Sequence, residues 1–184
     1  KKHSLREELL VRRNALSKEE WSLKSHQIQS RLKSRTEIRE ARTIHTYISM
    51  VSRNEADTLN LIQDLIDTGK DIMVPVIQPG TFLLNHSLLR GINDLKAQKW
   101  GVLEPKKTTL ADPQTVDLIL VPMVGADENK NRIGYGKGFY DRFLSESDKL
   151  KIGLCFECCI VDEIPVEHFD VALDMIVTEK RVIT

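Results

Sequence analysis

Hydrophobic and polar positions follow two different periods along the chain, and the period changes near residue 43. In the first forty residues the apolar positions follow helical spacing. Two serines precede these segments, each with a glutamate three residues later: Ser4 with Glu7, and Ser17 with Glu20. This capping-box spacing predicts two helices, separated by a break at residues 14–17.

After the break in period, short apolar runs alternate with helical segments. The alternation and the β-branched residues predict strands over residues 43–50, 71–77, 81–88, 115–123, 149–156 and 174–183. Helical spacing predicts helices over residues 57–70, ending at Gly69, and over residues 137–147. Several strands are apolar throughout, which is typical of strands covered on both faces. The sequence therefore predicts an α/β fold: a single domain, residues 1–184, with a mostly parallel (mixed) sheet covered by helices on both faces and an N-terminal helical arm.

Charge and cysteine content limit the classes of partner. Lysine plus arginine and aspartate plus glutamate number 27 each, so the chain has no overall field to attract nucleic acid or an anionic membrane. No apolar run reaches the length of a membrane span. The three cysteines are an odd number and lack a second metal-binding pair, so we expect free thiols in a reducing compartment, the cytoplasm. A monomer is expected, with a dimer as the alternative.

The segment "NRIGYGKGFYDRF", residues 131–143, carries the candidate chemistry. Glycines at alternate positions allow positive φ and let backbone N–H groups approach an oxyanion. Arg132 and Lys137 add positive charge, and a helix that begins near Gly138 would direct further N–H groups to the same place. Asp141, in the first turn of that helix, could hold a metal ion that bridges phosphates.

Two familiar phosphate-binding motifs do not match this loop. A Walker A loop needs glycine where Asn131 stands and serine or threonine where Gly138 stands. The dinucleotide-binding pattern needs a third glycine where Phe139 stands. From the residues alone, a phosphate-binding loop and a glycine-rich turn that lets a helix pack closely both remain open.

The wider segment "DLILVPMVGADENKNRIGYGKGFYDRFL", residues 117–144, resembles the signature of the 5-formyltetrahydrofolate cyclo-ligase family. Weaker blocks with the same resemblance occur in the family's order at residues 1–13, 47–58, 100–105 and 164–179. The resemblance implies an ATP- and Mg²⁺-dependent conversion of 5-formyltetrahydrofolate to 5,10-methenyltetrahydrofolate, with release of ADP and phosphate. ATP would phosphorylate the formyl oxygen, and N10 would then attack the activated carbon.

The resemblance also implies roles for individual residues. The residues expected to bind ATP are Lys2, Arg6, Arg132, Ile133, Gly134, Tyr135, Gly136, Lys137, Gly138, Phe139 and Tyr140. Arg132 and Lys137 among them are the expected catalytic cations. The residues expected to bind folate are Ile48, Glu55, Trp100, Tyr135, Gly136, Lys137, Gly138 and Phe139. Asp141 and Glu167 are the expected Mg²⁺ ligands. Some relatives have arginine where this chain has Tyr135, so the resemblance leaves open whether a second cation serves the γ-phosphate.

Each of these roles has a plainer alternative. Lys2 and Arg6 share one face of a helix and could simply be solvated. Asp141 could be an ordinary first-turn carboxylate, and Glu55 an acidic loop residue. Trp100 could be a packing anchor rather than a ring-stacking residue. For the whole protein, the rivals are a nucleotide-binding module without turnover and a small-molecule kinase that uses the same loop.

Overall fold

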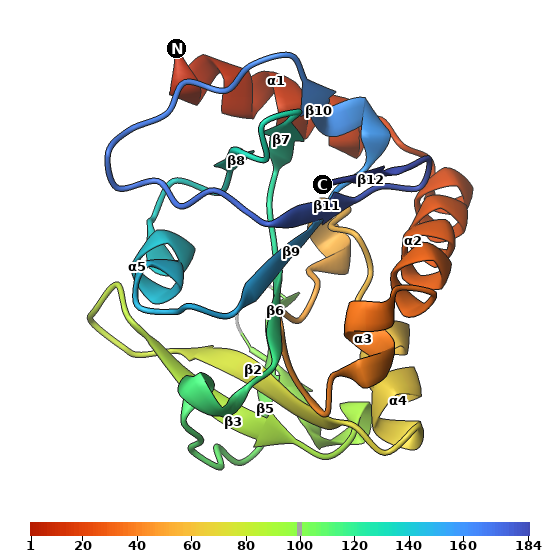
Figure 1. Cartoon of the computed structure of the whole chain (residues 1–184), viewed down its shortest axis with the longest axis vertical. Coiled ribbons are helices and arrows are strands. Elements are labelled where there is room, and N and C mark those ends of the chain that lie inside the picture. The colour runs from red at the N-terminus through yellow and green to blue at the C-terminus, as the bar shows by residue number, and fades with distance from the viewer. Residues whose placement is uncertain (99–100) are drawn as a thin grey trace.

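A seven-stranded sheet forms the centre of the computed structural model, which describes residues 1–98 and 101–184 (Figure 1). Its strand order is β12-β11-β9-β6-β1-β2-β3. The strands are β1 (Thr43–Thr46), β2 (Asp71–Ile77), β3 (Leu84–Leu89), β6 (Leu118–Val121), β9 (Leu150–Leu154), β11 (Met175–Val177) and β12 (Val182–Ile183). The five inner strands are parallel, whereas β3 and β12 pair antiparallel at the two edges. The predicted mixed, mostly parallel sheet is confirmed.

Helices cover both faces of this sheet, as predicted (Figure 1). The α-helices are α1 (Lys2–Asn14), α2 (Lys18–Lys33), α3 (Thr36–Glu40), α4 (Leu59–Asp67) and α5 (Phe139–Ser145). Apolar residues of α2, α3 and α4 pack on one face, and those of α1 and α5 pack on the other. None of the described helices is long and apolar enough to cross a membrane.

Smaller elements complete the fold. A three-stranded sheet, in the order β10-β7-β8, lies on the α1 side, and a two-stranded ribbon joins β4 to β5. These strands are β4 (Leu95–Ala97), β5 (Leu103–Pro105), β7 (Gly125–Asp127), β8 (Arg132–Ile133) and β10 (Ile160–Val161). The 3₁₀ helices are η1 (Val51–Arg53), η2 (Ile92–Asp94), η4 (Pro113–Thr115) and η5 (Glu157–Cys159). None of these short elements, nor α3, was predicted from the sequence, because runs of two to five residues are too short to establish a period.

The alternation of side chains along each strand divides the core in two. In β6, Leu118 and Leu120 are buried with the α2–α4 layer, whereas Ile119 and Val121 are buried with the α1 and α5 layer. Successive side chains of a strand point to opposite faces of its sheet. A strand that is buried on both sides is therefore usually apolar along its whole length, as β6 is.

Of the two predicted capping boxes, one is present in the structure and the other is not. Ser17 and Glu20 form a reciprocal capping box: Glu20 N–H donates to Ser17 Oγ (3.1 Å), and Ser17 N–H donates to Glu20 Oε2 (2.9 Å). The predicted box at Ser4 was wrong. Helix α1 already begins at Lys2, so Ser4 lies inside the first turn and caps nothing.

Hydroxyl groups shorten two of the predicted strands. The strand predicted over residues 43–50 ends at Thr46, where Thr58 Oγ1 donates to Tyr47 O and accepts from Ser49 N–H. The predicted strand over 174–183 is instead the hairpin of β11 and β12. There Thr178 Oγ1 accepts from the N–H groups of the two residues that begin the turn back, at positions 180 and 181. Both differences come from side-chain hydrogen bonds that compete with the strand ladder.

Two histidines are buried together between the sheet and α5. His45 of β1 and His86 of β3 share a hydrogen bond, with His45 Nε2 3.0 Å from His86 Nδ1. The ring of Phe143 lies over both of them, at centroid distances of 4.8 and 4.5 Å. Burial lowers the pKa of both histidines, and for His45 the neighbouring His86 lowers it further. Both rings are therefore neutral in the folded protein at pH 7.

This pair predicts a loss of stability in acid. Above the unfolded pKa of 6.5, the two histidines are neutral in both the folded and the unfolded chain, and the free energy of unfolding is not reduced by them. Below this pH only the unfolded chain takes up protons readily, so the free energy of unfolding declines. We expect the free energy of unfolding to fall by up to about 1.4 kcal/mol per pH unit for each histidine. Urea denaturation at pH 7.5, 6.5 and 5.5 measures this. The variant His45→Gln should show a smaller decline, and an equal decline would contradict the assignment.

Candidate active site

The site lies where two adjacent parallel strands send their connections in opposite directions. Strands β1 and β6 pair in parallel. After β1 the chain continues through α4 to β2, whereas after β6 it continues through α5 to β9. The two helices lie on opposite faces of the sheet. In α/β sheets, ligands usually bind at such a switch point, beyond the carboxyl ends of the two strands. The segments over residues 47–58 and 122–138 border it.

Glu55 is one of two buried acids in the first segment, the other being Asp57. Its side chain is oriented by two donors: Met50 N–H donates to Oε2 (2.7 Å), and the Tyr135 hydroxyl donates to Oε1 (2.6 Å). The indole N–H of Trp21 holds the backbone carbonyl of Glu55 from α2, at 2.7 Å. The predicted folate-anchoring acid and the glycine loop are therefore in direct contact, although 80 positions separate them in the chain.

Arg13 completes this contact from α1. Its side chain is 2% exposed, and its guanidinium donates to Met123 O (3.0 Å) and to the Tyr135 hydroxyl (2.6 Å). Burial, followed by the charge of Glu55, raises the pKa of Tyr135, so the hydroxyl keeps its proton. Arg13 was not among the site residues predicted from the sequence. The available signal was a cation four residues after Leu9, on the apolar stripe of the helix.

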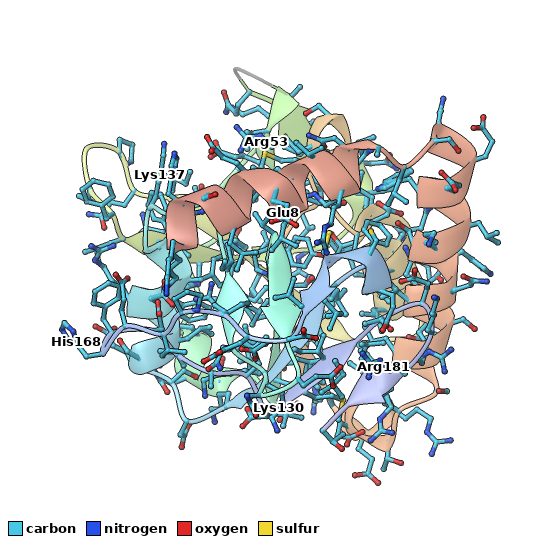
Figure 2. All side chains as sticks on the ribbon, turned by 90° about the horizontal axis from the view of Figure 1, so that it is seen from above. Glu8, Arg53, Lys130, Lys137, His168 and Arg181 are labelled. Atoms are coloured by element: carbon cyan, nitrogen blue, oxygen red, sulfur yellow. The ribbon has the colours of Figure 1, made fainter. Side chains whose placement is uncertain are left out.

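The glycine loop lies against the first turns of α1. Arg6 Nε donates to Gly134 O (2.7 Å), and a Cβ atom at Gly136 would lie 3.2 Å from the Arg6 guanidinium carbon. Gly136 and Gly138 have φ values of 88° and 69°, the left-handed region in which glycine is favoured. Lys137 between them is exposed. Figure 2 shows Lys137 and Arg53 on one side of α1, with Lys130 and Arg181 on the opposite side.

Arg132 and Asp141 form an ion pair beneath the loop. Arg132 Nη2 lies 2.5 Å from Asp141 Oδ1, and the arginine side chain is 5% exposed. Burial lowers the pKa of Arg132, whereas the charges of Asp141 and Asp170 oppose that effect. Asp170 also binds Lys2 of α1, which lies 3.6 Å from Glu167 Oε2. Two cations and three carboxylates thus connect the start of α1, the start of α5 and the loop before β11.

The two predicted metal ligands already have cationic neighbours. Asp141 uses one carboxylate oxygen for Arg132, and the exposed Glu167 lies beside Lys2. In the described parts of the chain, no group of three or more histidine, cysteine, aspartate or glutamate residues could hold a metal ion. This donor set suits Mg²⁺ only if phosphate oxygens and water complete its shell, which is how Mg²⁺ usually binds.

The other predicted residues have varied surroundings. Ile48 is partly buried and packs against the α2–α4 core, whereas Ile133 is fully buried in the other core. The Tyr140 hydroxyl is buried without a hydrogen-bond partner among the described residues. Phe139 lies 6.0 Å from Phe82 of the hairpin between β2 and β3, measured between ring centroids. Trp100 lies outside the described residues.

Comparison with known proteins gives a consistent result. The chain matches the sequence model of the 5-formyltetrahydrofolate cyclo-ligase family over residues 1–179. It is 30% identical to the 5-formyltetrahydrofolate cyclo-ligase of Escherichia coli K12, over 93% of this chain and 96% of that protein. It is 35% identical to that of Haemophilus influenzae, over 74% of this chain and 75% of that protein. The structure of Aquifex aeolicus 5,10-methenyltetrahydrofolate synthetase superposes with a TM-score of 0.86, at 29% identity, over 98% of this chain and 91% of that one.

The Arg132–Asp141 pair predicts a stability effect that needs no ligand. Asp141→Ala leaves a buried guanidinium without its partner, so we expect a loss of about 1–3 kcal/mol in the free energy of unfolding. Asp141→Asn keeps an oxygen acceptor and should lose less. Urea denaturation without added nucleotide or metal measures both, with Glu167→Ala as the exposed control that should change by less than about 0.5 kcal/mol. An unchanged stability in Asp141→Ala would show that the pair does not balance the buried charge.

Proposed function

Because the chain belongs to the 5-formyltetrahydrofolate cyclo-ligase family, we propose that it converts 5-formyltetrahydrofolate to 5,10-methenyltetrahydrofolate, using ATP with Mg²⁺ and releasing ADP and phosphate. One observation carries the proposal. Three segments with the family resemblance, namely the basic helix α1, the Glu55 segment and the glycine loop, meet through the contacts of Arg6, Arg13 and Tyr135. A site for two substrates that must react together requires this convergence.

The proposed chemistry explains why ATP is needed. A formamide oxygen is a poor leaving group until it carries a phosphoryl group. In the proposed reaction the formyl oxygen takes the γ-phosphoryl group, and the bond between that group and ADP breaks. N10 then attacks the formyl carbon and loses its proton, and the C–O bond breaks as phosphate departs. The protein's part in such a transfer is mainly to position the reactants and to neutralise charge.

We assign the folate contacts to the Glu55 segment and the ATP contacts to the glycine loop with α1. The Glu55 carboxylate would accept paired N–H donors of the pterin edge, with Ile48 against the ring system. The amides of the glycine loop, together with Arg6 and the exposed Lys137, would hold the triphosphate. Lys2, Trp100 and the remaining loop residues keep the roles that the resemblance implies.

Arg132 and Asp141 support the phosphate end of this site. The buried Arg132 ion pair holds the Asp141 carboxylate at the start of α5, beside the glycine loop. Asp141, with Glu167 as the second candidate, would hold Mg²⁺ together with phosphate oxygens and water. When bound, Mg²⁺ neutralises phosphate charge.

The expected surroundings of the protein belong to the same proposal. Cys155, Cys158 and Cys159 are all free thiols, which suits a reducing compartment such as the cytoplasm. The reduced folate and ATP are the proposed partners, without nucleic acid or membrane. A monomer, with a dimer as the alternative, and one domain over residues 1–184 remain our expectations.

One assay tests the proposed function against its rivals. The protein is mixed with Mg-ATP and 5-formyltetrahydrofolate, and the methenyl product is followed by its near-ultraviolet absorbance while ADP is measured. We expect both products to appear together, and neither to appear without ATP or in the presence of a chelator. ATP binding without either product would favour a module without turnover. ADP release only with another acceptor would favour a small-molecule kinase.

Two substitutions should separate the two substrates. Lys137→Ala removes the exposed loop cation, so we expect kcat to fall at least about 100-fold because the transferred phosphoryl charge loses a partner. Glu55→Ala should instead raise the Kd of 5-formyltetrahydrofolate by about 10- to 100-fold and change ATP binding little. Steady-state kinetics and direct titration measure these effects. Lys180→Ala, an exposed lysine in the turn between β11 and β12, is the matched control. Wild-type behaviour in both site variants would remove these two assignments.

A further inference from the structure

We propose that Arg13 and Tyr135 act as positioning residues that hold the Glu55 carboxylate in the orientation that binds folate. The hydrogen bonds that run from Arg13 through the Tyr135 hydroxyl to Glu55 are called the relay below. This inference rests on the proposed role of Glu55 as the folate anchor. Neither residue needs to touch the pterin for the relay to work. Its effect would be to keep one carboxylate in a single orientation before the substrate arrives.

Arg13 is a buried cation with few polar partners. Arg13 is 2% exposed, so its guanidinium loses most of its hydration, which is costly unless polar partners replace the water. In the described parts of the chain, no carboxylate lies within ion-pair distance of Arg13, and its Nε has no hydrogen-bond partner. Among the described residues, the guanidinium donates hydrogen bonds to Met123 O and to the tyrosine hydroxyl that leads to Glu55.

Hydrogen-bond chemistry sets the direction of the relay. A guanidinium can only donate, so the Tyr135 oxygen must accept from Arg13. The single hydroxyl proton is then free to point at Glu55 Oε1, 2.6 Å away. Because burial and the charge of Glu55 raise the pKa of Tyr135, that proton stays on the tyrosine. The cation therefore polarises the hydroxyl toward the acid and makes it a stronger donor.

The remaining acceptor capacity of Glu55 matches the proposed ligand. A carboxylate accepts about four hydrogen bonds, two on each oxygen. Met50 N–H occupies one position on Oε2, and Tyr135 occupies one on Oε1. One position is left on each oxygen, which is the arrangement that two parallel N–H donors of a planar ring require. The relay thus orients the carboxylate without filling its binding edge.

The relay also redefines what Tyr135 does in the glycine loop. Its hydroxyl is used inward, between Arg13 and Glu55. The guanidinium carbons of Arg13 and Arg53 lie 5.6 and 5.0 Å from the centroid of its ring. The side chain therefore serves the folate anchor rather than the γ-phosphate. The backbone of the same loop remains available to the triphosphate.

Direct binding measurements test the relay. In Tyr135→Phe, which removes one oxygen, we expect the Kd of 5-formyltetrahydrofolate measured without ATP to rise about ten-fold. The Kd of ATP should change less than about two-fold, and KM for folate should rise more than kcat falls. Arg13→Met should act in the same way, and the double variant should lose little more than the larger single loss. Tyr47→Phe is the control: it also removes a buried hydroxyl, one that donates to Ala56 O, but leaves both donors to Glu55 in place.

A charge exchange guards against variants that simply fold poorly. Tyr135→Arg alone places two guanidinium groups together and should weaken folate binding. Combined with Arg13→Met, the new arginine can donate directly to Glu55, and we expect folate binding to recover toward the wild-type value. Unchanged folate binding in Tyr135→Phe, or no recovery in the exchanged pair, would overturn the relay. A wild-type protein that binds no folate would overturn both the relay and the proposed function, whereas folate binding with insensitive variants would overturn the relay alone.

Discussion

The parallel pairing of β1 with β6 is the constraint on which the rest of the site depends. Thr46 of β1 pairs with Leu120 of β6, so both strands end at the same edge of the sheet. Each strand then continues to an opposite face, because α4 and α5 cover different sides. Two segments that are about 80 positions apart are brought into hydrogen-bond contact there. Without this pairing, the acid of one segment and the glycines of the other would have no common surface.

Close packing of α1 adds a third segment to the site, beside the Glu55 segment and the glycine loop. A Cβ atom at Gly125 of β7 would lie 2.6 Å from Cys159 O and 2.6 Å from Leu9 Cδ1 of α1, so only glycine allows this approach. The approach brings Arg13 to the carbonyl of Met123 and to the Tyr135 hydroxyl of the glycine loop. A packing requirement at one glycine therefore fixes the position of a buried charge.

In this chain, positive charge is concentrated locally at the candidate site rather than spread as an overall net charge. The net charge is +0, so no long-range field selects an anionic substrate. Instead, Arg6, Lys137 and the pair formed by Arg132 and Asp141 gather around one loop. Burial strengthens the pair of Arg132 and Asp141, since water screens it little. A buried charge needs a polar partner, and Arg132 has one in the Asp141 carboxylate. Arg6, which is partly buried, donates to Gly134 O, whereas Lys137 is exposed to water.

The sequence by itself determined the class of fold, the order of the main strands and helices along the chain, and the glycine loop. Side-chain period and glycine spacing are properties of neighbouring residues. It also pointed to Glu55 and Tyr135 through resemblance. Only the tertiary structure decided the order of the strands within the central sheet, the short sheet of β7, β8 and β10, the hairpin of β11 and β12, and the partners of Arg13. Those features depend on contacts between residues far apart in the chain, and no local period records which distant donor reaches which acceptor. Arg13 looks like any helical arginine until the fold buries it beside Tyr135.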